Sequence, residues 1–105
     1  MNDVKVYMVV NLDIKDQDTY LKYEKGFFPI LKKHGGEFIT FDDSVRHLEG
    51  PEPLPGGRVI IFSFPSEAAA DGWYNDPEYQ ELSQFRREGA PLRSLSLVKG
   101  LPPRK

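Results

Sequence analysis

One stretch, from Phe62 to Tyr79, constrains the fold more than any other part of the sequence. It begins with the apolar residues of a buried strand and continues through two helix starts. Ser66 follows Pro65 as an N-cap residue would, and Asp76 precedes a proline, which suits the first helical position because its missing N–H needs no partner there. We therefore expect a strand that leads into two successive helices.

The rest of the chain alternates between strand and helix patterns, and its glycines and prolines mark the boundaries. Strands are predicted over residues 4–12, 37–49 (with a bend near 42–44), 58–64 and 92–98, and helices over about 16–34, 66–75 and 77–88. This order is βαββαβ with an extra helical turn, the ferredoxin-like α+β arrangement of one antiparallel sheet with helices on one face. We predict a single domain over residues 1–105 with a frayed tail from about residue 101.

Composition excludes several classes of function. The chain of 105 residues has no cysteine, which excludes disulfides, thiolate metal sites and cysteine nucleophiles. Its formal net charge of -2 gives no general attraction for nucleic acid. The start of the chain lacks a basic, apolar leader, and its apolar runs are shorter than a membrane span. We expect a cytoplasmic protein that binds neither nucleic acid nor membrane.

The two most apolar strands carry apolar residues on both faces. In the first, either the set of Val4, Val6, Met8 and Val10 or the pair of Tyr7 and Val9 must point away from the helices. The same holds for Val59 and Ile61 against Ile60, Phe62 and Phe64 in the third strand. A monomer would expose a large apolar patch, and such patches mark interaction surfaces. We therefore predict a homodimer formed through the open face of the sheet.

Several segments together resemble a known family. They are Tyr7–Asp13, Tyr20 with Tyr23, His34-Gly35-Gly36, Leu48-Glu49-Gly50, Arg58–Ser66, Trp73–Tyr79 and Lys99-Gly100. In these segments the chain resembles the domain-of-unknown-function 1330 family, of the dimeric α+β barrel superfamily. The resemblance implies two ferredoxin-like protomers joined through their sheets, and it implies no established reaction. Where the family often has Arg-Gly-Gly, this chain has Phe41-Asp42-Asp43, so an anion site built on that arginine does not carry over.

Large amphipathic side chains gather beside titratable ones in one part of the sequence. Trp73, Tyr74 and Tyr79 can wall a small-ligand pocket on the helix side of the sheet, with Asn11 and His34 as nearby polar groups. The alternative for Trp73 and Tyr79 is a purely structural place in the core, which is the more common fate of such residues. For His34, general acid–base catalysis competes with the plainer role of a histidine that ends a helix. If the protein is an enzyme, His34 is our prediction for the catalytic residue.

Other charged residues have weaker claims to chemistry. With two histidines and no ligand spacing, no metal site is predicted. Four arginines are able to bind a substrate carboxylate, although most are expected to be solvated ion-pair partners; they are Arg46, Arg58, Arg86 and Arg87. The third strand superficially resembles an RNA-recognition motif, but Val59 and Ile61 stand where bases would stack.

Two classes of function remain open. The superfamily resemblance suggests a small-molecule enzyme without a tightly bound cofactor, which would work by acid–base chemistry with His34, Tyr74 or Asn11 as participants. The other class is a non-catalytic dimer that binds a small apolar or weakly acidic ligand or serves as a scaffold. A pocket with converging polar groups would favour the enzyme, whereas a filled interior would favour the scaffold.

Overall fold

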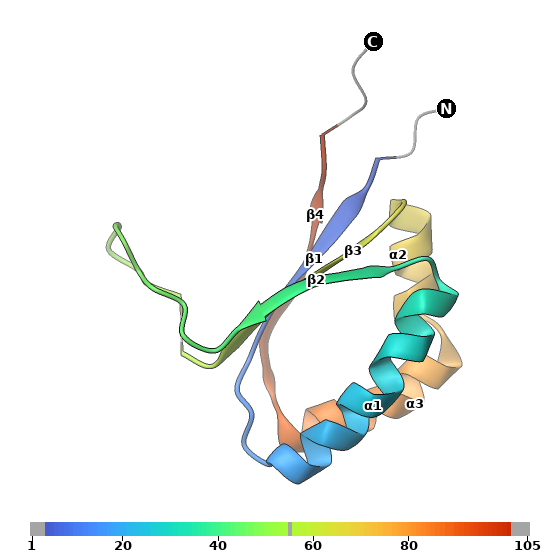
Figure 1. The fold of residues 1–105 in the computed structure, drawn as a ribbon, viewed down its shortest axis with the longest axis horizontal. Helices are drawn as coiled ribbons and strands as arrows, with labels where there is room; N and C mark the ends of the chain where they lie inside the picture. Colours follow the sequence, from blue (N-terminus) through green and yellow to red (C-terminus); the bar gives the residue numbers. More distant parts are fainter. Residues whose placement is uncertain (1–3, 55, 102–105) are drawn as a thin grey trace.

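The computed structural model describes residues 4–54 and 56–101. Its elements are β1 (Val6–Leu12), α1 (Gln17–Lys33), β2 (Glu37–Asp42), β3 (Arg58–Phe64), α2 (Glu67–Tyr74), α3 (Pro77–Gly89) and β4 (Leu92–Lys99). The strands form one antiparallel sheet in the order β2-β3-β1-β4, and the helices lie on one side of it (Figure 1). The predicted α+β fold class is confirmed, while the predicted frayed tail falls mostly outside the described residues.

The two predicted helix caps, Ser66 and Asp76, both form, and the structure adds Asp16 as the cap of the first helix. The carboxylate of Asp16 accepts a hydrogen bond from the backbone N–H of Thr19 at the start of α1. Ser66 does the same for α2, and the Asp76 carboxylate accepts from the backbone N–H of Glu78 at 2.9 Å at the start of α3. Gly35, which follows α1, has a φ of 74°, a conformation that glycine adopts without steric cost.

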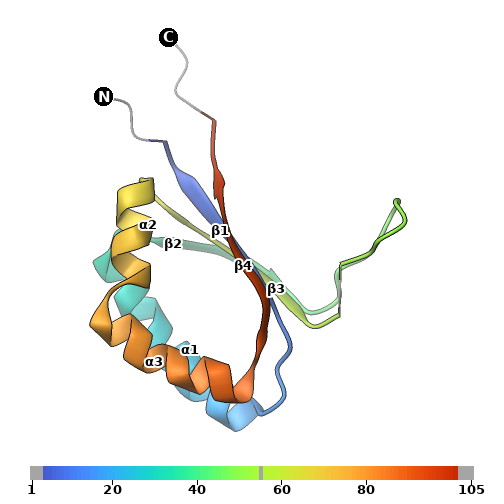
Figure 2. The same ribbon diagram turned by 180° about the vertical axis from the view of Figure 1, so that it is seen from behind.

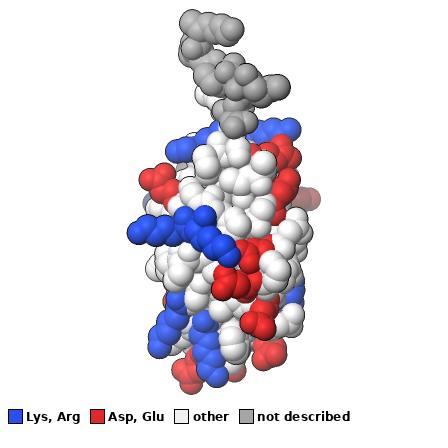
Figure 3. All heavy atoms as spheres, turned by 90° about the vertical axis from the view of Figure 1, so that its right-hand side faces the viewer, with Lys and Arg blue, Asp and Glu red and all other residues white. Residues whose placement is uncertain are grey.

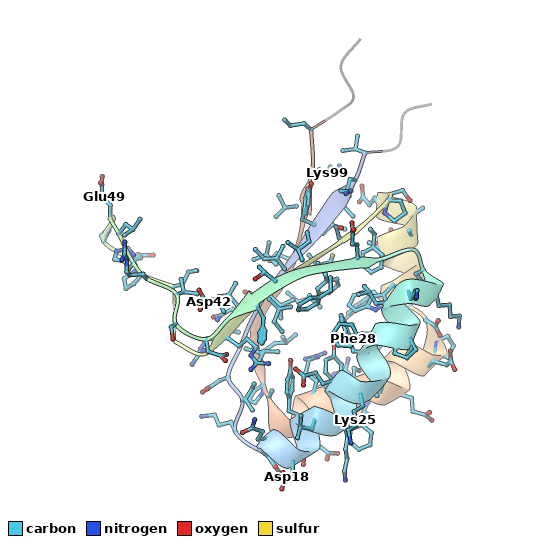
Figure 4. The ribbon with its side chains drawn as sticks, in the orientation of Figure 1. Asp18, Lys25, Phe28, Asp42, Glu49 and Lys99 are labelled. Carbon is cyan, nitrogen blue, oxygen red and sulfur yellow. The ribbon has the colours of Figure 1, made fainter. Side chains whose placement is uncertain are left out.

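The second strand is shorter than predicted. It ends at Asp42 instead of Glu49, because the Asp42 carboxylate turns back to accept from the backbone N–H of Ser44 at 2.7 Å and so turns the chain out of the ladder. The described residues between β2 and β3 then extend as an arm beyond the sheet, with Glu49 at its far end (Figures 1 and 4). The prediction of a strand over 43–49 was wrong.

The register of the sheet decides which apolar residues face the helices. Met8 lies opposite Phe62, and Val10 lies opposite Ile60, in the β1–β3 pair. All four are buried in the core beneath the helices. The alternating residues, which include Tyr7 and Val9 on β1 and Val59 and Ile61 on β3, lie on the opposite face. No helix of the described residues covers that face (Figure 2).

The helical layer has a mixed surface. Basic and acidic side chains are interspersed over it, with uncharged surface between them (Figure 3). Among the helices that the structure describes, none combines the length and apolar character needed to cross a membrane.

Candidate functional site

A cavity of about 120 Å³ lies between the sheet and the helices α1 and α3. It is lined by Val10, Leu12, Tyr20, Tyr23, Glu24, Phe27, Phe28, Phe38, Phe41, Arg58, Ile60, Phe62, Trp73, Tyr79, Arg86, Leu92 and Leu95. An apolar cavity of about 150 Å³ accommodates a benzene molecule. The space therefore has roughly the size of a single ring, on the side of the sheet where the sequence predicted a pocket.

Aromatic rings form the inner wall of the cavity. Trp73 is fully buried, with its ring centroid 4.1 Å from that of Tyr79 and 5.3 Å from that of Phe62. Phe27 packs edge-on against Phe62 at 5.2 Å. The ring-to-ring packing fixes these side chains in place, so the wall is rigid and preorganised.

Three phenylalanines mark the mouth of the cavity. Phe28 on α1 and Phe38 and Phe41 on β2 line the cavity and yet remain between 37% and 46% exposed. The rings of Phe28 and Phe38 are 5.4 Å apart, and Phe28 points from α1 toward the sheet (Figure 4). The cavity thus opens between α1 and the edge strand β2.

Tyrosine hydroxyls supply polar groups inside the cavity. The hydroxyl oxygens of Tyr23 and Tyr79 are 3.0 Å apart and hydrogen-bond to each other. Burial raises the pKa of Tyr20 to about 12 and raises the pKa of Tyr23 well above its ordinary value. Both phenols are therefore neutral at physiological pH and act as hydrogen-bond donors and acceptors, not as anions.

Arg58 closes one side of the cavity and has its charge matched within the chain. Its Nε lies 2.7 Å from Oδ1 of Asp43, and its Nη1 lies 3.2 Å from Oε2 of Glu24. Its guanidinium carbon also lies 4.2 Å from the ring centroid of Phe41. The hydrogen bond from Arg58 lowers the pKa of Asp43, which keeps this ion pair charged at neutral pH.

Arg86 lines the same cavity and has no counter-ion among the described residues. Its side chain belongs to a residue that is only 4% exposed, and Nε has no hydrogen-bond partner. Within residues 4–54 and 56–101, no carboxylate lies within ion-pair distance of its guanidinium. Its guanidinium carbon lies 6.0 Å from the ring centroid of Tyr23. The indole Nε1 of Trp73 is likewise buried without a partner.

The structure brings together only some of the residues that the sequence predicted for the site. Trp73 and Tyr79 line the cavity, and they are core residues at the same time. Tyr74 is 39% exposed and does not line it. Asn11 is buried but alternates along β1 with the cavity-lining Val10 and Leu12, and its amide nitrogen donates to the backbone oxygen of Arg58.

His34 lies at the C-terminus of α1, outside the set of residues that line the cavity. Its Nε2 hydrogen-bonds to Oδ2 of Asp76 at 2.8 Å, and Lys33 reaches the same oxygen at 2.9 Å. The helix-ending position agrees with the structural alternative for His34. Its catalytic role stays a prediction.

Sequence reasoning missed two groups of cavity residues. Tyr20 and Tyr23 were named only among the segments that resemble the family, and Arg86 was one of four candidate arginines, but none was placed in the pocket. One signal was present: Arg86 follows Tyr79 by seven residues, which is about two helical turns and puts both on one face of α3. Among the described residues, no group of three or more His, Asp and Glu side chains gathers as a metal site would require.

Comparisons with known proteins place this geometry in a wider context. A protein of unknown function from Rhodopseudomonas palustris has a similar structure, with a TM-score of 0.72 and 22% identity, over 98% of this chain and 85% of that one. A nipsnap family protein of unknown function from Agrobacterium tumefaciens has a TM-score of 0.58 and 20% identity, over 98% of this chain and 91% of that one. SnoaB, a cofactor-independent oxygenase from Streptomyces nogalater, has a TM-score of 0.52 and 8% identity, over 97% of this chain and 96% of that one.

These likenesses establish the fold, which is that of the dimeric α+β barrel proteins. Among curated proteins, no sequence matches this chain significantly. The model of one family, the domain of unknown function DUF1330, matches residues 5–101, which is nearly the whole chain and confirms the resemblance seen in the sequence. The chain therefore belongs to the DUF1330 family.

Proposed function

We propose that this protein binds a small organic molecule with an apolar ring in the cavity between the sheet and helices α1 and α3. The observation that carries the proposal is the pair of buried, unpartnered N–H groups, on Trp73 and Arg86, beside an aromatic-walled space of about 120 Å³. Buried donors normally have acceptors, so a site that leaves two of them free is suited to a ligand that supplies the acceptors.

Intrinsic fluorescence offers a direct test, because Trp73 is the only tryptophan in the chain. A neutral single-ring probe such as benzyl alcohol should change Trp73 emission saturably and raise the unfolding temperature. Leu95→Phe places a larger side chain at the cavity wall and should weaken this binding. Leu97→Phe is the matched control, since Leu97 is also partly buried on β4 but does not line the cavity. Equal binding by both variants, or no saturable response in the wild type, would contradict the proposal.

A second candidate function is catalysis on such a molecule without a bound cofactor. The likeness to SnoaB, a cofactor-independent oxygenase, supports this candidate at the level of the fold. Tyr20, Tyr23 and Tyr79 line the cavity, and their hydroxyls are among its polar groups. His34→Ala and Tyr20→Phe separate the two sites for proton transfer. Loss of turnover in His34→Ala alone would support the histidine, and loss in Tyr20→Phe alone would support the cavity hydroxyl.

We further propose that the open face of the sheet joins two copies of the chain. Tyr7, Val9, Val59 and Ile61 lie on this face, partly exposed and apolar, which is the composition of an interface. Analytical ultracentrifugation should then show twice the monomer mass at micromolar concentration. Ile61→Asp should dissociate the dimer, whereas Lys25→Asp on the exposed surface of α1 should not. A wild-type monomer would exclude the proposal.

A further inference from the structure

Arg86 is a buried residue whose charge has no carboxylate partner among residues 4–54 and 56–101. A guanidinium does not lose its proton in proteins, so Arg86 cannot avoid the cost of burial by becoming neutral. Its position near the end of α3 gives it the favourable but partial charge of a helix C-terminus. That partial charge does not supply the acceptors that a guanidinium fork needs, and Nε remains without one.

The groups around Arg86 cannot neutralise it. The phenols of Tyr20 and Tyr23 are neutral, because burial raises the pKa of each, and the Arg86 charge only partly opposes that rise. Among the described residues that line the cavity, Glu24 is the only one with a carboxylate, and it is bound to Arg58 at 3.2 Å. The described residues therefore supply no negative charge to Arg86, and a bound anion would supply one.

We propose that the ligand of this cavity is a single-ring aromatic carboxylate, with Arg86 as the anchor for its carboxylate group. The planar guanidinium matches a carboxylate in a two-point hydrogen-bonded pair, and the aromatic wall of Phe27, Phe62 and Trp73 receives the ring. This inference rests on the proposed function and adds to it the charge and chemical class of the ligand.

The surroundings favour one negative charge over two. Arg86 is a single unmatched cation, whereas Arg58 already has two carboxylates within 4 Å. A dianion such as a phosphate ester would bring one charge more than Arg86 matches, near the Glu24 carboxylate. The small volume excludes a large headgroup together with a ring. Tyr20 and Tyr23 line the same cavity, so their hydroxyls are further polar groups beside the proposed carboxylate site.

Three probes separate the charge from the ring. Benzoate carries both, benzamide carries the ring without the charge, and acetate carries the charge without the ring. Binding is measured by titration of Trp73 fluorescence and by calorimetry at low ionic strength. We expect benzoate to bind at least about tenfold more tightly than benzamide or acetate, since hydrogen bonds to charged groups in a buried site are the strong ones.

Arg86→Met removes the charge and keeps an unbranched side chain, and it should reduce benzoate binding to the level of benzamide. Arg87→Met is the matched control, because Arg87 is the next residue on α3, is exposed, and does not line the cavity. It should leave the preference for benzoate intact. If Arg86→Met does not fold, Arg86→Lys, which keeps the charge but not the planar fork, should weaken benzoate binding about tenfold.

Each result supports or overturns a defined statement. A preference for benzoate that is lost only in the Arg86 variants supports the inference. Equal binding of benzoate and benzamide, or an unchanged preference in Arg86→Met, overturns the carboxylate anchor while the proposed ring-binding function stands. If acetate binds as tightly as benzoate, the statement that the aromatic wall binds the ring of the ligand is wrong. Absence of binding by all three probes overturns both the inference and the proposed function.

Discussion

The two ends of helix α3 differ in how many partners their buried charged side chains have. At the N-terminal end, Asp76 is 8% exposed and its carboxylate binds three partners: the His34 ring, the Lys33 ammonium and the backbone N–H of Glu78. At the other end, Arg86 is 4% exposed and no carboxylate of the described residues reaches it. The Asp76 carboxylate therefore has its partners within the chain, whereas the Arg86 guanidinium has no carboxylate partner among the described residues.

This difference separates structural groups from candidate functional ones. The hydrogen bond from His34, followed by that from Lys33, lowers the pKa of Asp76, which shows that the folded chain favours its charged form. Such a group stabilises the fold by itself. The Arg86 guanidinium has few hydrogen-bond partners in the folded chain, and its burial costs free energy. Binding of a ligand therefore explains its position better than a contribution to stability does. His34, Lys33 and Asp76 are easier to notice in the sequence as candidate functional residues than Arg86 is. The group whose hydrogen bonds are incomplete, however, is Arg86 in the cavity.

The largest expected effect is the loss of the Asp76 carboxylate. Asp76→Ala removes the cap of α3 and leaves His34 and Lys33 without their shared partner, so thermal unfolding should occur about 5–10 °C lower. Asp16→Ala is the control, because Asp16 also caps a helix but has no such partners. Equal losses in the two variants, measured by circular dichroism, would mean that the cluster adds nothing beyond the cap.

The hydroxyl pair of Tyr23 and Tyr79 tests whether the cavity contains satisfied groups as well. Tyr23→Phe leaves the Tyr79 hydroxyl without its partner and should reduce the free energy of unfolding by about 1–2 kcal/mol. The double variant with Tyr79→Phe should cost less than the sum of the two single changes, which chemical denaturation can show. Tyr74→Phe serves as the exposed control and should change stability by less than about 0.5 kcal/mol. Strict additivity would contradict the pairing.

For Arg86 the comparison predicts a change of opposite sign. Arg86→Met removes an uncompensated buried charge and should raise the free energy of unfolding by about 1 kcal/mol in the absence of any ligand. Chemical denaturation of the ligand-free protein measures it, with Arg87→Met as the exposed control. A loss of stability larger than about 1 kcal/mol would show that Arg86 contributes to the fold as Asp76 does.

The sequence predicted the elements of the fold well because their signals are local. Asp76 before Pro77 and Ser66 after Pro65 fix helix starts through contacts within a few residues. The end of β2 was missed because the carboxylate of Asp42 that ends it also sits in a pattern compatible with a bent strand. The pattern of apolar and polar residues predicts that a strand or helix exists more reliably than it predicts the residue at which the element ends.

The cavity was predicted less well because its residues come from elements far apart in the chain. Asn11 was expected in the pocket, yet the two-residue period of β1 already separates it from Val10 and Leu12. That Arg86 has no partner is a property of the folded chain. The pairing of Glu24, which lines the same cavity, with Arg58 is likewise a contact between α1 and β3 that no local pattern contains.

The smallest expected effect is a pH dependence of the unfolding temperature that comes from the Asp76 carboxylate. The folded state lowers the pKa of Asp76 below its ordinary value of about 4, so the carboxylate contributes its stability above that value and loses it as the pH falls further. Asp76→Asn keeps an N-cap side chain and removes only the charge. The difference in unfolding temperature between the wild type and this variant should therefore stay constant between about pH 5 and 6 and narrow by about 2 °C or more toward pH 2.5. A difference that is constant down to pH 2.5 would show that the Asp76 charge, despite its three partners, does not stabilise the fold, and the contrast with Arg86 would then rest on Arg86 alone.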